Sequence, residues 1–194
     1  HYIVTAQQKD KELLRILRYE DPDSAIIFCN TRADVRYLTA VLQRNHLDAD
    51  MIQGEMTQSA REAVMRRIKA GELRFLVATD VAARGIDISD LSHVISYTAP
   101  EVPEMYLHRT GRTGRAGKKG TAISLIGPRE IGAFYYLKLL YKILPEEREL
   151  PSESELRTRR EADRYARIAE EIAEDPGDEW LSLARRVWQS GEGE

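Results

Sequence analysis

Apolar residues follow two alternating patterns through the first 145 residues of the chain. Continuous apolar runs at residues 24–29 (SAIIFC) and 74–79 (RFLVAT) are typical of strands covered on both faces. Further strand candidates are shorter and lie at residues 2–5, 49–53, 91–97 and 120–126. Between them, apolar residues at helical spacing predict helices at residues 9–20, 31–45, 57–71, a short segment from 103 and 129–144. The alternation predicts an α/β fold in which helices cover both faces of a parallel sheet.

The ends of several predicted helices carry recognisable signals. Thr31 is a candidate N-cap, with Asp34 at the third helical position. Gly71 suits the residue after a helix end, and Pro103 suits the first turn of one. Pro145 is expected to stop the last helix of the α/β part.

The pattern changes after Pro145, which predicts two domains, residues 1–145 and residues 146–194. Ser152 and Glu155 form a capping box ahead of a long amphipathic helix that extends to about Glu174. The sequence Asp-Pro-Gly-Asp at 175–178 breaks that helix, and a second short helix is expected to follow it. The second part is therefore a small α-helical extension.

Apolar side chains form one stripe on each helix of the extension. We expect them to mediate a homodimer through residues 146–194. The residues expected at the dimer interface are Tyr165, Ile168 and Ile172 on the first helix and Trp180, Leu183, Val187 and Trp188 on the second. Two alternatives remain open, in which the helices pack on their own core or bind RNA.

Charge is divided unevenly between the two parts. Residues 1–145 hold 21 Lys and Arg against 17 Asp and Glu, whereas residues 146–194 hold 8 against 15. A polyanionic partner is therefore expected on the first part, and the acidic extension is a poor candidate for RNA binding.

Several classes of protein are excluded by composition. The single cysteine, Cys29, lies in an apolar run and is expected to be a buried thiol, so neither a disulfide framework nor a cysteine metal site is expected. The four histidines are scattered, and no metal site is predicted. No apolar run is long enough to cross a membrane, and the first residues do not resemble a signal peptide, so we expect no membrane contact and a cytoplasmic location.

The candidate chemistry centres on residues 105–120, MYLHRTGRTGRAGKKG. Arg109, Arg112 and Arg115 recur at every third residue with glycines between them. This spacing places the arginines on one side of a helix or turn, where they would repel one another without an anion between them. Because guanidinium groups bind phosphate oxygens in pairs, the segment is expected to face a polyphosphate.

Three loops are expected at the edge formed by the carboxyl ends of the strands, where open parallel sheets bind ligands. They are residues 30–32, residues 78–88 and the arginine segment, and Gln58 and Arg61 extend the same edge. Each loop alone also fits an ordinary capped helix or a solvated surface charge, and Thr79 and Asp80 suit the cap of a short helix. Together, the loops favour phosphate binding.

These segments resemble the DEAD-box RNA helicases, in the second, C-terminal RecA-like domain. Residues 78–88 (ATDVAARGIDI) are similar to motif V of that family and residues 106–115 (YLHRTGRTGR) to motif VI. Residues 25–32 resemble motif IV, and residues 58–61 resemble the Q-x-x-R element. The resemblance covers about residues 2–145, and it departs from the family pattern at Gln-Gly-Glu 53–55, where His-Gly-Asp is usual.

The resemblance implies a role for each motif residue. Arg112 and Arg115 would be arginine fingers for ATP, Gly85 and Asp87 would contact the nucleotide, and His108 and Arg109 would couple the two RecA-like domains. The RNA sugar-phosphate backbone would be held by Thr31, Arg32, Gln58, Arg61, Thr79, Asp80 and Arg84. The partners implied are RNA and an N-terminal RecA-like domain of the same protein.

The sequence contains neither a phosphate-binding G-x-x-x-x-G-K-[ST] loop nor a DEAD box. ATP with Mg²⁺ is therefore expected to be bound mainly by the missing N-terminal domain, and the 194 residues alone are expected to be inactive. Two alternative functions remain: a DNA-remodelling translocase with the same core, and an assembly module in which the core is a spacer.

Overall fold

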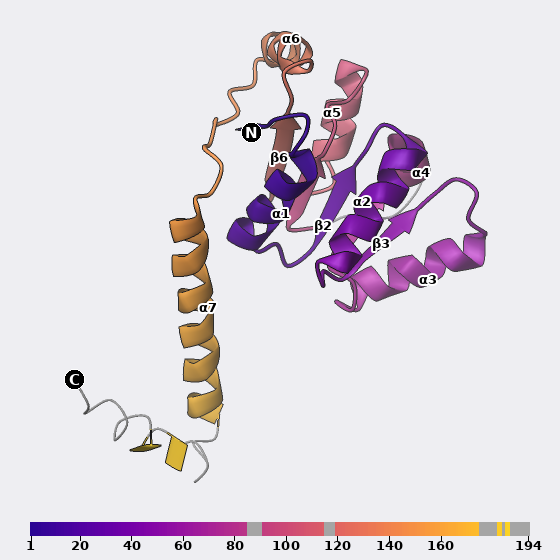
Figure 1. Ribbon diagram of the computed structural model, residues 1–194. Coiled ribbons are helices and arrows are strands. Elements are labelled where there is room, and N and C mark those ends of the chain that lie inside the picture. The colour runs from indigo at the N-terminus through magenta and orange to yellow at the C-terminus, as the bar shows by residue number, and fades with distance from the viewer. Residues whose placement is uncertain (85–90, 115–118, 175–181, 184, 187–194) are drawn as a thin grey trace. The chain divides into compact units, whose positions relative to one another are not determined.

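The computed structural model describes residues 1–84, 91–114, 119–174, 182, 183, 185 and 186. Six parallel strands form one sheet in the order β1-β6-β5-β2-β4-β3 (Figure 1). The strands are β1 (Tyr2–Ile3), β2 (Ala25–Phe28), β3 (Ala49–Ile52), β4 (Phe75–Ala78), β5 (His93–Ser96) and β6 (Thr121–Ile126). The helices are α1 (Lys9–Glu20), α2 (Arg32–Arg44), α3 (Gln58–Lys69), α4 (Asp80–Ala83), α5 (Pro103–Thr110), α6 (Ile131–Tyr141) and α7 (Glu153–Glu174). The predicted α/β fold with a parallel sheet is confirmed.

Alternate residues of the central strands point to opposite faces, and each face has its own hydrophobic core. In β2, Ile27 packs in the core that contains residues of α1 and α2, whereas Ile26 and Phe28 pack in the core that contains Val64 of α3 and Ala82 of α4. All four residues of β2 and of β4 are buried. The continuous apolar runs in the sequence therefore correspond to strands covered on both faces, as predicted.

The helix boundaries follow the predicted signals except in α6. Thr31 caps α2, because its hydroxyl oxygen accepts a hydrogen bond from the Asp34 backbone N–H at 3.0 Å. Gly71, with φ of 74°, follows the end of α3. In contrast, α6 ends at Tyr141, where Lys142 adopts a left-handed conformation with φ of 51°. The prediction that Pro145 ends this helix was wrong, since the turn at Lys142 comes first.

The order of the strands creates a crevice between β2 and β5. After β2 the chain passes through α2, on one face of the sheet, to β3 at one edge. After β5 it passes through α5 to β6, which lies next to β5 in the other direction along the sheet. α5 lies on the opposite face from α2, because its Arg109 guanidinium lies over the Phe28 ring, 5.2 Å from the centroid. In open parallel sheets, ligands bind outside the carboxyl ends of two such diverging strands.

The chain divides into two compact units, His1–Leu150 and Pro151–Glu194. Residues 146–150 thus belong to the first unit. The Arg148 guanidinium bonds to Glu20, its backbone N–H bonds to the His1 carbonyl at 2.9 Å, and Leu150 packs on the core of α1 and α2. In the described part of the chain, no helix is both long enough and apolar enough to span a membrane.

The second unit is described mainly by α7. The Ser152 backbone N–H donates to the Glu155 carboxylate at 2.7 Å, and the Glu155 N–H donates to the Ser152 hydroxyl at 3.2 Å. The predicted capping box is therefore present, and its hydrogen bonds lower the pKa of Glu155. The predicted second helix lies largely outside the described residues.

Candidate functional site

Arg109 is the hub of the site at the carboxyl ends of β2, β4 and β5. Its side chain is fully buried, and its five N–H donors are all used. They bond to both carboxylate oxygens of Asp80 (2.8 and 2.7 Å), the Ser96 hydroxyl (3.3 Å), the Thr98 carbonyl (2.6 Å) and the Asn30 side-chain oxygen (2.9 Å). One side chain thus ties the loops after three strands to α5.

This arrangement determines which polar groups remain available at the edge. Both oxygens of Asp80 accept from Arg109, and Asn30 also donates from its amide to the Ala99 carbonyl at 2.9 Å. Asp80 was expected to contact RNA, but its carboxylate is engaged inside the protein. Its neighbour Thr79 caps α4 by accepting from the Ala82 N–H at 3.3 Å, which is the short-helix alternative considered from the sequence.

The segment after Arg109 leaves this edge and runs towards the opposite one. The Thr113 hydroxyl donates to the carbonyl of Leu91, which precedes β5, and the two residues form a parallel bridge. The expectation that the whole arginine segment lies at the carboxyl edge was wrong, because Thr113 binds beside the start of β5. His108, in the last turn of α5, is exposed, and Arg112 is half-buried.

Close backbone packing fixes the path of this segment. A Cβ atom added to Gly120 would overlap the Thr113 hydroxyl oxygen and the Gly114 backbone nitrogen, and one added to Gly111 would lie 3.1 Å from the Leu107 carbonyl. Gly114 itself has φ of 68°, which favours glycine. The glycines between the arginines therefore serve the turn itself, which presents Arg112 in a defined place.

The other predicted RNA ligands lie after β2 and β3. Thr31 donates its hydroxyl to Asp34 at 2.7 Å, and Arg32 forms an ion pair with Glu55. Gln58 is exposed in the first turn of α3. The register aligns Phe28 of β2, Ala78 of β4 and Ile52 of β3, so the loops after these three strands share one edge.

Arg61, one turn into α3, carries a buried Nε atom without a hydrogen-bond partner. Arg84 is exposed and follows α4. These two guanidinium groups bring positive charge to the edge, which suits phosphate groups, whereas the charge of Arg32 is paired with that of Glu55.

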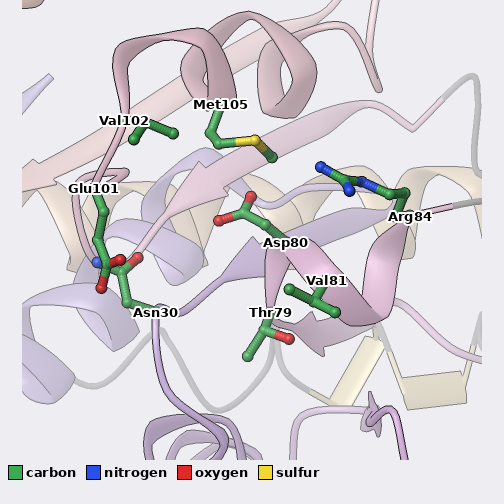
Figure 2. Close-up of a pocket in the computed structure, with 8 residues that line it drawn as sticks. All are labelled: Asn30, Thr79, Asp80, Val81, Arg84, Glu101, Val102 and Met105. Carbon is green, nitrogen blue, oxygen red and sulfur yellow. The ribbon is translucent and has the colours of Figure 1, made fainter.

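A pocket of about 210 Å³ opens between α4 and the loop that leads into α5 (Figure 2). Figure 2 shows Arg84 and Glu101 at opposite ends of it, with the Asp80 carboxylate and the Met105 thioether between them. Its lining residues are Asn30, Thr79, Asp80, Val81, Arg84, Glu101, Val102 and Met105. The pocket lies at the carboxyl ends of β2 and β5, where the connections that follow these paired strands lead in different directions.

Part of the predicted site lies outside the described residues. These residues are Gly85, Asp87 and Arg115, together with Trp180, Val187 and Trp188 of the extension. The side chain of Ile172 also falls outside the description, whereas Tyr165, Ile168 and Leu183 are exposed. None of the roles expected for these residues is tested by the geometry.

Sequence reasoning did not single out Ser96, Glu101 or Met105. Ser96 is an inward-facing strand residue, and its contact with Arg109 emerges only from the packing of α5 on β5. Glu101 lies between the apolar strand and the arginine segment, and Met105 is the first residue of that segment; no spacing marks either of them. Only their position after a strand that ends in the crevice could have indicated them.

Comparisons with known proteins agree with this geometry. Residues 8–117 match the family described as helicase conserved C-terminal domain. ATP-dependent RNA helicase DeaD of Escherichia coli (strain K12) is 35% identical over 194 residues, which are 100% of this chain and 31% of that protein. DEAD-box ATP-dependent RNA helicase CshA of Geobacillus kaustophilus is 40% identical over 139 residues, 71% of this chain and 30% of that protein. The chain thus spans less than a third of the length of these relatives.

A solved structure has the same fold. It is that of the Escherichia coli DEAD-box protein SrmB bound to regulator of ribonuclease activity A, which superposes with a TM-score of 0.70 at 35% sequence identity. The match covers 80% of this chain and 90% of that one. With more than half of its residues matched by the family model, the chain belongs to the helicase conserved C-terminal domain family, as the RecA-like C-terminal domain of the DEAD-box RNA helicases.

Proposed function

We propose that this chain is the second RecA-like half of an ATP-dependent RNA helicase and that it contributes arginine fingers to ATP hydrolysis. The observation that carries the proposal is the bond between Arg109 and Asp80, which joins the motif VI segment to the motif V segment. A rigid joint between these segments would let a change at the nucleotide move the RNA-binding loops, which is what a motor domain requires.

In this proposal, Arg112 and Arg115 act on the γ-phosphate of ATP. Each presents a permanent positive charge where negative charge develops in the transition state. Gly85 and Asp87 would contact the nucleotide, which a preceding RecA-like domain would hold together with Mg²⁺. His108, exposed in the last turn of α5, would contact that domain and couple its state to Arg109 beneath.

RNA would bind along the carboxyl edge of the sheet. The guanidinium groups of Arg32, Arg61 and Arg84 would neutralise phosphates, while Thr31 and Thr79 would offer hydroxyl groups. Gln58 would add an amide contact from α3. We assign Asp80 an indirect part here, because its carboxylate is held by Arg109 and places Thr79 and Arg84 around it.

A double substitution, Arg112→Ala with Arg115→Ala, tests the arginine fingers. It is made in the protein that joins this chain to its proposed amino-terminal domain. RNA-stimulated ATP hydrolysis is expected to fall at least about 10³-fold, because arginine fingers contribute about 10³–10⁵ to the rate. RNA affinity, measured separately by fluorescence anisotropy, is expected to change little.

Arg129→Ala is the matched control, since Arg129 is exposed before α6 and outside the site. It removes one arginine charge, as each of the two finger substitutions does, and should retain the parent rate. Hydrolysis at the parent rate by the double variant would refute the role of the fingers. Comparing stimulation by RNA and by DNA in the same assay decides between a helicase and a DNA translocase.

The 194 residues alone are proposed to hydrolyse no ATP. The sequence lacks both the phosphate-binding loop and the DEAD box, so the fingers have no bound nucleotide to act on. Phosphate release from the isolated chain with ATP, Mg²⁺ and RNA should remain at the level of buffer. RNA-dependent turnover by the chain alone would contradict this assignment.

For the extension, residues 146–194, we propose homodimerisation. Tyr165 and Ile168 of α7 are 76% and 43% exposed and lie three residues apart, so they share one face of the helix. A second copy of the same stripe would cover them in a two-fold contact. Light scattering of Tyr165→Glu with Ile168→Glu should show monomers where the parent shows dimers, and a monomeric parent at high concentration would refute the proposal.

A further inference from the structure

The pocket between Arg84 and Glu101 contains two charged side chains that have no hydrogen-bond partner in the described part of the protein. Asp80 and Asn30 are occupied by Arg109 and by the Ala99 carbonyl. In contrast, among the described residues neither the Arg84 guanidinium nor the Glu101 carboxylate makes a hydrogen bond or an ion pair; the Arg84 backbone N–H donates to the Val81 carbonyl at 3.3 Å. A free cation and a free carboxylate therefore face the same hollow from its two ends (Figure 2).

Three apolar side chains also line the pocket, beside Asp80 and Asn30, whose polar groups are bonded within the protein. Val81 and Val102 line the pocket although they are 80% and 49% exposed, and the Met105 thioether lies above the Asp80 carboxylate in Figure 2. In that view Val81 lies on the side of the pocket opposite Met105. Aliphatic side chains on two sides of a narrow space suit the faces of a flat ring, which lose water on entering it. At about 210 Å³, the pocket is smaller than most drug-sized sites and suits a single planar group.

The loop that carries Glu101 is held in place. The Asn30 backbone N–H bonds to the Thr98 hydroxyl at 2.9 Å, and the Ala99 N–H bonds to the Glu130 carboxylate at 2.7 Å. Together with the bond from the Asn30 amide to the Ala99 carbonyl, these contacts fix the loop on both sides of the crevice. Glu101 is therefore presented by an ordered segment, so less entropy is lost when a ligand binds it.

From these observations we propose that the pocket binds one base of the RNA strand and that Glu101 gives it a preference for guanine. This inference rests on the proposed RNA binding at the same edge. Arg84 holds the phosphate, the ring lies between Val81 and Met105, and the carboxylate of Glu101 accepts from the base edge. The chain thereby reads one position of a strand that it otherwise holds by the sugar-phosphate backbone.

Guanine fits because its edge offers two donors side by side, the N1–H and the N2 amino group, to the two oxygens of a carboxylate. Adenine and cytosine each offer only an amino group on that edge. Uracil offers its N3–H between two carbonyl oxygens, which a carboxylate repels. Glu101 is thus expected to rank guanine first and uracil last.

Three single-stranded RNA decamers test the proposal with the 194-residue chain by fluorescence anisotropy at fixed salt. One alternates guanosine with uridine, the second has inosine in place of each guanosine, and the third contains only uridine. Inosine lacks the N2 amino group and is otherwise identical to guanosine. The guanosine decamer should bind at least about tenfold more tightly than the inosine decamer, because a hydrogen bond from the amino group to a charged acceptor is lost.

Glu101→Gln should reduce this ratio to near one while leaving the affinity for the uridine decamer unchanged or slightly higher. Glu104→Gln is the matched control, since Glu104 is exposed on α5 and does not line the pocket. It makes the same change of charge and should retain the parent ratio. Arg84→Ala should weaken all three decamers alike.

Equal binding of the three decamers by the parent chain would overturn the guanine pocket and leave the proposed backbone contacts intact. Loss of discrimination in both the Glu101 and the Glu104 variants would also overturn it, because the effect would then follow overall charge. Failure of the parent to bind any decamer would instead refute the proposed RNA binding on which the pocket rests.

Discussion

The burial of Arg109 makes it a structural residue as well as a motif residue. A lysine at this position would supply three donors from one point, whereas five acceptors are arranged around the planar guanidinium. Arg109→Lys should lower the free energy of unfolding by at least about 2 kcal/mol, because two of the five acceptors would lose their donor and each buried group left unsatisfied costs about 1–3 kcal/mol. Urea denaturation followed by circular dichroism measures this change.

Arg129→Lys, at an exposed position, provides the comparison and should change the free energy of unfolding by less than about 0.5 kcal/mol. A loss of under about 1 kcal/mol for Arg109→Lys would show that water or a shifted side chain replaces the missing bonds. The hub would then not be what holds the three loops together.

Cys29, directly after β2, is the second residue with a defined chemical consequence. The side chain is fully buried, and burial raises the pKa of its thiol to about 12, from an ordinary value of about 9. The unfolded chain therefore loses this proton at lower pH than the folded one, so this contribution to stability is complete below about pH 9 and is lost as the pH rises towards 12.

At pH 8 the folded protein should react with a thiol reagent only through opening of the core, because the thiolate is the nucleophile. Labelling is expected to be orders of magnitude slower than for the urea-unfolded chain and to accelerate with added urea. Rapid stoichiometric labelling in native buffer would contradict the burial of Cys29. The sequence predicted this thiol correctly, since an apolar run of strand length leaves no exposed position within it.

At the level of elements, alanine substitutions at two glycines are expected to have opposite effects on stability. Gly120 leads into β6 where the Thr113 side chain and the Gly114 backbone nitrogen leave no room for a Cβ atom, whereas Gly132 in α6 has open space around it. Gly120→Ala should destabilise the protein by at least about 2 kcal/mol through overpacking and displacement of the arginine segment. Gly132→Ala should stabilise it by about 0.5–1 kcal/mol, because alanine favours the helix.

Thermal denaturation of the two variants side by side measures both effects. Equal stabilities would mean that the turn at Thr113 can move without cost, and the segment that carries Arg112 would then lack a fixed path. A change in the same direction for both variants would also contradict the contacts described here.

The order of elements along the chain could be predicted from the sequence, but their ends and crossings could not. Periodicity gave the strands around Ile27 and Val77 and the helices between them, because each pattern follows from burial on a particular geometry. The end of α6 at Lys142 was missed, since no composition signal marks a lysine in the left-handed conformation. The sequence also did not predict that the segment with Thr113 lies beside Leu91, because this placement depends on a long-range hydrogen bond.

At the level of the whole molecule, the boundary of the α/β unit matters for any truncated protein. Residues 146–150 bind the first unit through Arg148 and Leu150, although the sequence pattern changes at Pro145. A chain that ends at Leu150 should unfold cooperatively, and one that ends at Pro145 should be less stable than it by about 1–3 kcal/mol, because an apolar contact and an ion pair are removed.

Differential scanning calorimetry of the two truncated chains checks this difference. Identical unfolding temperatures would show that residues 146–150 contribute nothing to the first unit. Arg148→Ala in the chain that ends at Leu150 separates the two contributions, since it removes the ion pair with Glu20 and retains Leu150.

The candidate site could be predicted only in part at this scale. Motif-bearing loops after β2, β3 and β4 lie at one edge as expected, because parallel strands present their carboxyl ends together. Which carboxylate is free was not predictable, since the pairing of Asp80 with Arg109 and the exposure of Glu101 result from packing between distant segments.

The placement of β1 beside β6 has a consequence for synthesis of the protein. Tyr2 pairs with Leu125 on one side and forms a bridge with Arg148 on the other. β1 can therefore pair only after more than a hundred later residues have been synthesised. Contacts of such sequence separation form slowly. A nascent chain that pauses before β6 thus leaves β1 without its partner strand, and a chaperone that shields β1 until β6 has been synthesised would raise the yield of native protein.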